Sequence, residues 1–241
     1  MYTPAPRIEW PVRADLFECL RRAGLIAAAF LLLLLPYEPP KPSSQSLIAV
    51  EVQAGAKLAD FKGENASAEA RQVANWVTRS GDNLARSFVI LDKREARVFL
   101  FDARGSLIGA TPVLLGAAAG DESVAGIGKR PIAEVRPEER TTPAGRFIAE
   151  AGRNALGEDV LWVDYEAAVS MHRVRVVDPR ERRLERLASP SAADKRISYG
   201  CVNVPVSFFE NVLLPHFKGR QLIVYVLPEV KTLHSAFPGF L

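Results

Sequence analysis

The hydrophobic period changes along the chain, and each period predicts a different kind of element. Between residues 55 and 79, apolar positions recur at three- and four-residue steps, which is typical of one face of an amphipathic helix. The stripe consists of Ala66, Ala70, Val73, Ala74 and Val77. Gly81 follows it, and glycine is a common residue just past a helix end. We therefore predict a helix over 55–79 that leads into the main domain.

From Ser87 onward, apolar and polar positions follow a period of two, which is the pattern of β-strands. Three strand-like runs open this part, at 88–92, 96–102 and 107–115, with a turn at 103–105. We expect further strands at 145–149, 161–163 and 169–177, a helix at about 205–217 and a last strand at 221–227. Because the last run is almost entirely apolar, we expect it to lie in the centre of the sheet.

An uncharged apolar segment, 23–35, precedes this pattern. It is shorter than the roughly 20 residues of a membrane helix and resembles the apolar part of a signal sequence. Four arginines precede it and the first basic residue after it is Lys41, so we expect the N-terminus to lie in the cytoplasm. We favour an uncleaved anchor over a removable signal, because no small-x-small site follows. A buried core helix is disfavoured by the prolines at 36, 39, 40 and 42.

These patterns predict a leader and one mainly β domain. The predicted segments are a cytoplasmic or pre-signal tail at 1–22, a signal anchor at 23–37, a linker and leading helix at 38–83, the main domain at 84–228 and a C-terminal tail at 229–241. The expected location is the inner membrane, with the main domain in the periplasm or cell envelope.

Composition and cysteine usage narrow the classes of function. Of the 241 residues, 48% are hydrophobic and 24% charged, and the net charge is only +3 with the basic residues spread along the chain. This argues against nucleic acid as a partner. The two cysteines, Cys19 and Cys201, lie on opposite sides of the apolar segment, so an anchor would keep them in different compartments. An unpaired thiol in an oxidising space suggests a chemical role for Cys201.

The surroundings of Cys201 suit a nucleophile. It stands in the run Ser-Tyr-Gly-Cys-Val-Asn, 198–203, just before the helix expected near Pro205. A helix N-terminus favours the thiolate, and the glycine permits unusual backbone angles. Successive N–H groups near Tyr199, Gly200 and Cys201 could bind an oxyanion, while Ser198 and Asn203 shape the turn. The alternative is an inert core thiol, since free cysteine is often buried.

A thiol nucleophile also needs a base, and the chain offers three histidines. His172 lies in the middle of a strand-like run and can be held rigidly there, whereas His216 is at the end of a helix and His234 is in the tail. His172 is therefore the predicted general base. Its alternative role is that of a hydrogen-bonded core histidine.

Together these residues resemble the active-site signature of bacterial L,D-transpeptidases. The match consists of the run at 198–203 with a histidine upstream, the Thr-Pro-x-Gly-x-Phe segment at 142–147, and flanking strands at 89–113 and 219–224. The resemblance covers about 84–227 in the family's order. Tyr199 stands where many members have histidine, and the gap between His172 and Ser198 is longer than usual.

That longer gap holds an insertion, 178–196, with a run of basic residues. The arginines are Arg180, Arg182, Arg183 and Arg186. They form either an ordinary solvated surface or a patch that steers anionic wall polymer toward the site. We read the insertion as a surface loop or short helix beside the site.

The resemblance implies a mainly β fold, an L,D-transpeptidase-like β-sandwich or barrel with a few short helices, in addition to the N-terminal membrane-anchor helix. It also implies a reaction in which Cys201 attacks a peptidoglycan stem tetrapeptide, releases D-Ala through a thioester and passes the acyl group to an amine. Phe147 and Thr142 are expected to border the substrate. Neither a metal nor an organic cofactor is expected, because the three histidines are scattered and one exported cysteine is too few for a metal cluster.

Three alternatives stay open at this point. Water as the acceptor would make the protein an L,D-carboxypeptidase. The accepting amine could also belong to a wall-anchored protein instead of another stem peptide. From a different class, the chain could be a non-catalytic wall-binding scaffold, in which case Cys201 need not be unusually reactive.

Overall fold

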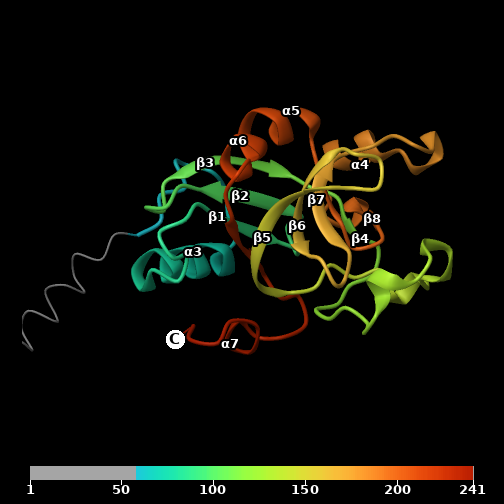
Figure 1. Cartoon of the computed structure of the whole chain (residues 1–241). Helices are drawn as coiled ribbons and strands as arrows, with labels where there is room; N and C mark the ends of the chain where they lie inside the picture. Colours follow the sequence, from blue (N-terminus) through green and yellow to red (C-terminus); the bar gives the residue numbers. More distant parts are fainter. Residues whose placement is uncertain (1–57, 241) are drawn as a thin grey trace, which may run out of the picture. The chain divides into compact units, whose positions relative to one another are not determined.

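The computed structural model of the chain describes residues 58–240, which form a mainly β structure with a few short helices (Figure 1). The predicted anchor at 23–37 and Cys19 lie outside the described residues. Within 58–240, no helix combines the length and apolar character that a membrane crossing requires.

Eight strands form one sheet in the order β3-β2-β1-β10-β5-β6-β7-β9. Their bounds are β1 Phe88–Asp92, β2 Arg97–Phe101, β3 Leu107–Pro112, β5 Gly145–Arg153, β6 Asp159–Asp164, β7 Val169–Arg173, β9 Val202–Val204 and β10 Leu222–Val226. The pairs β1–β10 and β7–β9 are parallel and the other pairs are antiparallel. The predicted central place of the last strand is confirmed, because every residue of β10 is buried between β1 and β5.

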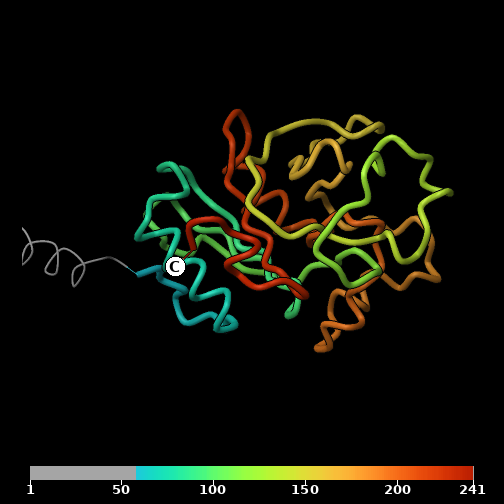
Figure 2. The backbone as a smooth tube through the Cα atoms, turned by 90° about the horizontal axis from the view of Figure 1, so that it is seen from below, coloured from blue at the N-terminus to red at the C-terminus, as the bar shows by residue number. Residues whose placement is uncertain are grey.

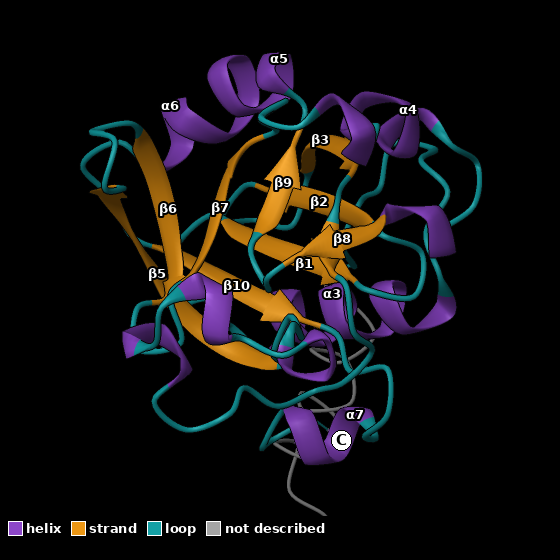
Figure 3. Ribbon diagram, turned by 90° about the vertical axis from the view of Figure 1, so that its right-hand side faces the viewer, coloured by secondary structure: helices purple, strands orange, loops and turns teal. Residues whose placement is uncertain are grey.

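The sheet nearly closes on itself. Asn203 in β9 exchanges both of its backbone hydrogen bonds with Leu114, just after β3, at 2.9 Å each. Two short strands, β4 (Leu115–Gly116) and β8 (Arg196–Ser198), pair in parallel beside this junction. The result is a barrel-like arrangement in which the two ends of the strand order meet (Figure 3).

The leading helix, α3 (Ala68–Ser80), ends where predicted but begins later. Gly81 closes it in the left-handed conformation at φ 71°, while the Ser67 hydroxyl caps its start by accepting from the Ala70 N–H. The prediction that the helix already includes residues 58–67 is wrong, because α3 begins at Ala68. There the chain pairs with the β2–β3 turn instead, through Asp60 and Ser106.

Two hydrophobic layers cover the two faces of the sheet. On one face, α3 and the C-terminal α7 (Leu233–Ala236) pack with aromatic and apolar side chains of β1, β2 and β10. Figure 2 shows the C-terminal segment lying beside α3, where Trp76 contacts Phe237 and Phe240. Both helices lie outside the predicted domain limits of 84–228.

On the other face, a continuous helical stretch covers the larger core. It comprises α5 (Val206–Phe208), a π-helical turn (Phe209–Leu213) and α6 (Leu214–Phe217), which confirms the helix predicted at 205–217. The remaining helix is α4 (Arg183–Ala188), inside the insertion, and short 3-10 turns lie at 127–129, 132–134, 137–139, 179–181 and 193–195. Strand β7 ends at Arg173, before the predicted end at residue 177.

Candidate active site

Strands β7 and β9 bring the predicted nucleophile and base together. Their register pairs Met171 with Val202 and His172 with Asn203, so Cys201, one residue before β9, lies opposite Ser170. The Ser170 hydroxyl lies 3.7 Å from Cys201 Sγ. Because side chains alternate along a strand, these polar side chains share one face while Met171 and Val202 enter the core.

Cys201 is half-buried, and its thiol is activated by its neighbours. Burial acts to raise the pKa of the thiol, but the hydrogen bond and positive charge of His172 and the hydrogen bonds from Ser170 outweigh that effect. The pKa of the Cys201 thiol is therefore lowered from its ordinary value. A lowered pKa means more of the nucleophilic thiolate at neutral pH.

The ring of His172 is oriented by the backbone of its own strand. Its Nδ1 lies 2.8 Å from the carbonyl oxygen of Arg173. A carbonyl oxygen can only accept a hydrogen bond, so Nδ1 carries the proton and the lone pair of the neutral ring is on Nε2. This is the tautomer that a general base needs, with a backbone carbonyl in the orienting role.

A compact hydrogen-bonded turn presents Cys201. The Ser198 hydroxyl donates to the Cys201 carbonyl at 2.6 Å and accepts from the Gly200 N–H at 3.1 Å. Gly200 has φ 130°, and a Cβ there would lie 2.7 Å from the Thr141 carbonyl oxygen. Both the backbone angle and the close approach therefore require glycine at this position.

The predicted oxyanion donors divide into two kinds. The Gly200 N–H is already used by Ser198 Oγ, which corrects the expectation that it is free for a substrate. The N–H groups of Tyr199 and Cys201 donate to no acceptor among residues 58–240. These two are the remaining backbone donors beside the thiol for a developing negative charge.

Thr142 and Asn203 hold this turn from behind. Thr142 is fully buried, and its hydroxyl donates to the Gly200 carbonyl at 2.9 Å while accepting from the Gly116 N–H at 3.0 Å. This corrects its predicted contact with substrate, because the side chain is inaccessible and its hydrogen bonds are used. Asn203 is also fully buried and donates to the Cys201 carbonyl at 3.3 Å.

The structure places Phe147 in a strand. It lies in β5 opposite Val224 of β10, and its ring packs against the core beneath α5 and α6. The polar site residues point to the other face of the sheet. Packing against the core is the contact that the structure gives Phe147, and its expected contact with substrate stays a prediction.

Two features near Cys201 were not predicted. Ser170 could have been found, because it lies two positions before His172 in the same alternating run and so shares its face. Arg140 could not, since it comes from the long segment between β4 and β5. Its guanidinium lies 4.0 Å from the centre of the Tyr199 ring, next to the Gly200 turn.

A buried ion pair supports that long segment. Lys93 Nζ is fully buried and donates to Asp121 Oδ1 at 2.7 Å, to the Gly120 carbonyl at 2.6 Å and to the Thr142 carbonyl at 2.9 Å. Burial acts to raise the pKa of Asp121, but Lys93 and the backbone N–H groups of residues 229–231 lower it to about 2. The pair thus connects the β1–β2 turn, the C-terminal tail and the segment that holds Gly200.

The arginines of the insertion are largely paired with nearby groups. Arg180 binds Asp178 at 2.8 Å, Arg182 pairs with Glu185, and Arg183 binds Glu181 at 2.6 Å. Arg183 also donates to Asn203 Oδ1 at 2.6 Å, which ties the insertion to the site. Local pairing weakens the net field of the insertion and favours the solvated-surface alternative over steering.

No family model matches the chain, and no curated protein matches it. Solved structures give weak likenesses. One is an L,D-transpeptidase from Enterococcus faecium, with 15% identity over 58% of this chain and 50% of that chain and a TM-score of 0.33. A second is the catalytic domain of an E. faecium L,D-transpeptidase, with 16% identity over 58% of this chain and 98% of that chain and a TM-score of 0.34. A third is the helical cell shape determining protein Pgp2 from Campylobacter jejuni, with 12% identity over 69% of this chain and 58% of that chain and a TM-score of 0.39.

The likeness spans about half the length of the first of these structures and 58% of the Campylobacter one. Because every one of these TM-scores lies below 0.4, the overall likeness assigns neither a family nor an activity.

Proposed function

We propose that this chain is a cysteine acyltransferase of the L,D-transpeptidase type that acts on peptidoglycan stem peptides. The observation that carries the proposal is the activated thiol: Cys201 is half-exposed, has a lowered pKa and lies beside His172 across two neighbouring strands. The peptidoglycan substrate is supported by the sequence resemblance at 142–147 and 198–203.

In the first half-reaction, His172 Nε2 takes the proton of the Cys201 thiol. The thiolate attacks the carbonyl carbon of the third residue of a tetrapeptide stem, and the N–H groups of Tyr199 and Cys201 bind the resulting oxyanion. The bond between that carbon and the nitrogen of D-Ala breaks. The nitrogen takes the proton from His172, so that D-Ala leaves and a thioester remains.

In the second half-reaction, an amine from a neighbouring stem attacks the thioester. His172 takes its proton, the Cys201 thiolate leaves, and an amide cross-link is formed. Attack by water would release a tripeptide instead and make the enzyme an L,D-carboxypeptidase. The chemistry requires only groups that the chain itself supplies.

The proposal is tested with the full-length protein in mild detergent, purified tetrapeptide muropeptides and mass spectrometry of the products. Wild type should release D-Ala and form cross-linked dimers, whereas Cys201→Ala and His172→Ala should do neither. His234→Ala is the matched control, because that histidine is exposed in the C-terminal segment. Release of D-Ala without dimers would assign a carboxypeptidase. No release, together with a Cys201 that does not react with thiol reagents, would leave the scaffold.

The second part of the proposal is the location: residues 23–37 anchor the chain in the inner membrane and the catalytic domain lies outside the cytoplasm. The two cysteines provide the test. In intact cells, a thiol reagent that cannot cross the inner membrane should label Cys201 and leave Cys19 unlabelled. Labelling of neither cysteine until the cells are lysed would place the domain in the cytoplasm and contradict the proposal.

A further inference from the structure

The sheet face that carries the thiol continues into an open aromatic hollow. The strand registers pair Glu150 of β5 with Trp162 of β6, and Trp162 with Ser170 of β7, which lies opposite Cys201. These four residues therefore form one row across the sheet. Neighbouring strands lie about 4.8 Å apart, so the Trp162 backbone is about 10 Å from that of Cys201.

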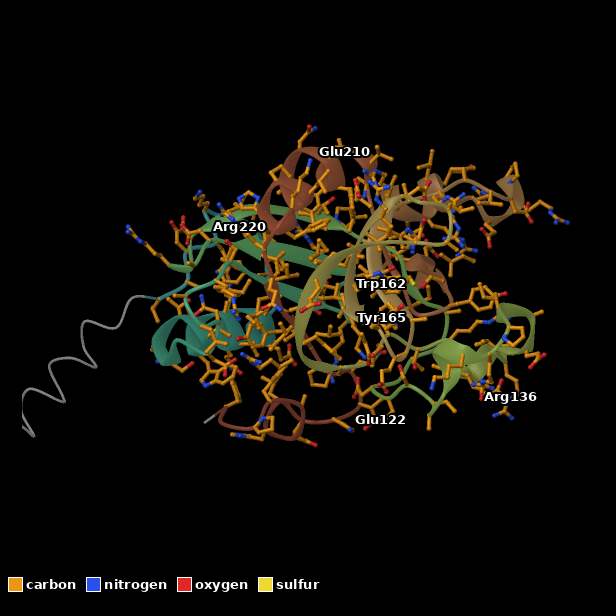
Figure 4. All side chains as sticks on the ribbon, in the orientation of Figure 1. Glu122, Arg136, Trp162, Tyr165, Glu210 and Arg220 are labelled. Atoms are coloured by element: carbon orange, nitrogen blue, oxygen red, sulfur yellow. The ribbon has the colours of Figure 1, made fainter. Side chains whose placement is uncertain are left out.

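The hollow has a volume of about 420 Å³ and is open to solvent on the β5–β6 hairpin. Its lining includes Ile148, Glu150, Gly152, Arg153, Trp162 and Tyr165. Tyr165 is 76% exposed and Ile148 48% exposed, an unusual exposure for two large apolar side chains that line one hollow. Figure 4 shows Trp162 and Tyr165 close together on this part of the molecule.

The two aromatic rings are held in place before any ligand binds. Their centroids lie 5.2 Å apart at an interplanar angle of 73°, which is a favourable edge-to-face arrangement. The indole lies against the backbone of Gly152, where a Cβ would approach Trp162 Cδ1 to 2.4 Å. A glycine near the end of β5 thus makes room for the indole, and a rigid platform loses little entropy on binding.

The chemistry of the hollow favours a ring-shaped, uncharged ligand. Trp162 itself is paired on both sides, with Glu150 of β5 and Ser170 of β7, so the backbone beneath the two rings offers no free strand edge to an extended peptide. The charged groups already have partners, because Glu150 accepts from Gln221 at 2.5 Å and Arg153 faces Asp159 at 3.7 Å. An apolar ring face flanked by polar side chains suits a sugar, whose C–H face stacks on an aromatic ring while its hydroxyls bind polar groups.

We propose that the hollow at Trp162 and Tyr165 binds a sugar ring of the glycan strand whose stem peptide reaches Cys201. The source of the sugar rests on the proposed function, while the stacking site itself does not. The distance agrees with this arrangement. One extended residue spans at most about 3.5 Å, so the three residues before the scissile bond cover about 10 Å, the separation of Trp162 from Cys201.

The first experiment compares two substrates on the full-length protein: a disaccharide-tetrapeptide and the same tetrapeptide without sugar. Wild type should prefer the sugar-bearing substrate in kcat/KM by about fivefold, the range expected of one aromatic stacking contact. Trp162→Ala and Tyr165→Ala should abolish this preference while the rate on the free tetrapeptide is kept. Trp162→Phe should retain part of it, because an aromatic ring remains.

Leu156→Ala is the matched control, since Leu156 is an exposed apolar residue on the same hairpin but outside the hollow. It should keep the full preference. Equal kcat/KM values of wild type for the two substrates would overturn the proposal. A preference that survives in both Trp162→Ala and Tyr165→Ala would also overturn it. Because the Tyr165 side chain is largely exposed, its replacement should leave the fold intact.

The second experiment does not depend on catalysis. Full-length Cys201→Ala is mixed with a peptide-free disaccharide of the glycan strand, and binding is read by saturation-transfer NMR on the sugar. Transfer should be strong in Cys201→Ala and absent when Trp162→Ala is added. Sugar binding in a protein that releases no D-Ala would refute the proposed function and keep the sugar site. D-Ala release without sugar binding or sugar preference would refute the sugar site and keep the proposed function.

Discussion

The two halves of one sheet face show how the same strand geometry serves stability in one place and chemistry in the other. Over β1 and β10, the face is apolar and aromatic and lies under α3 and α7. Over β5, β6 and β7, it carries Glu150, Trp162, Ser170 and His172 and stays partly open. The boundary lies at Tyr225, whose hydroxyl shares the Asp82 carboxylate with an arginine of β5.

The difference teaches that the covering helix, not the sheet, separates core from site. Aromatic residues occur on both halves, but the covered ones contact other aromatic rings on several sides, whereas Trp162 and Tyr165 contact mainly each other. An aromatic side chain without a cover is free to contact a ligand. Five changes test this comparison, from the largest expected effect to the smallest.

Trp76→Ala should break the covered half. The ring is nearly buried, packs edge-on against Tyr225 and Phe240, and donates to the Gly239 carbonyl at 3.0 Å. We expect the free energy of unfolding to fall by about 3–5 kcal/mol, measured by urea denaturation. Trp162→Ala, its counterpart on the open half, should cost less than about 1 kcal/mol. Equal losses in the two variants would refute the division of the face.

Gly200→Ala should disable the open half while the protein remains folded. The new Cβ would clash with the Thr141 carbonyl at 2.7 Å and displace the turn that presents Cys201. A displacement of about 1 Å at a reacting group lowers activity by about a hundredfold, which D-Ala release would measure. Gly157→Ala is the control, because its φ is also positive, at 77°, but nothing lies within 4 Å of its Cβ position. Full activity of Gly200→Ala would contradict the assignment of this turn.

Asp121→Asn should remove a pH-dependent stabilisation. The pKa of Asp121 is lowered to about 2, so its contribution is complete above the unfolded value of 3.8 and is lost as the pH falls through the folded value. The shift corresponds to about 2 kcal/mol near neutral pH. The difference in unfolding free energy between wild type and variant should therefore shrink between about pH 4 and pH 2. Glu122→Gln, which removes one exposed negative charge from the neighbouring position, is the control.

His172→Asn should change the reactivity of the thiol. His172 lowers the pKa of Cys201 through a hydrogen bond and its positive charge, so its loss should raise that pKa. The rate of alkylation by iodoacetamide, measured against pH, should then rise at higher pH than in wild type, and the rate near neutral pH should be lower. His234→Asn should leave the profile in place. An unshifted profile in His172→Asn would mean that the two side chains do not interact.

Replacing Arg180 and Arg182 by serine should have the smallest effect. Their side chains are 90% and 69% exposed and pair with acidic residues of the same segment. We expect kcat/KM and its dependence on salt to stay within about twofold of wild type, since paired surface charges contribute little. A clear loss of salt sensitivity would instead support steering of an anionic wall polymer by the insertion.

Much of the strand framework was predictable because it depends on local pattern. The apolar runs of β1, β2 and β10 are buried on both faces of the sheet, and the Gly-Cys turn has its own backbone requirement. The start of α3 was not predictable in this way. A helical stripe cannot reveal that Asp60 pairs with the β2–β3 turn, which keeps the preceding residues out of the helix.

The contacts that position the site could not be predicted for the same reason. Thr142 and Phe147 lie in one motif, yet Thr142 precedes β5 and is buried beneath Gly200, whereas Phe147 lies within β5 and packs against the core. The buried Lys93 contradicts its usual preference for the surface and is explained only by three oxygen partners from distant parts of the chain. Such contacts depend on tertiary structure, and no local signal reports them.

The central place of β10 has a consequence for how the protein is made. This strand follows every other strand of the sheet along the chain, yet it joins β1 to β5. Until it emerges from the ribosome, β1 and β5 would each expose an unpaired edge, which favours aggregation. The sheet can therefore be completed only after synthesis has passed residue 226, and a polypeptide interrupted before that point would be a substrate for chaperones and proteases, not a smaller folded domain.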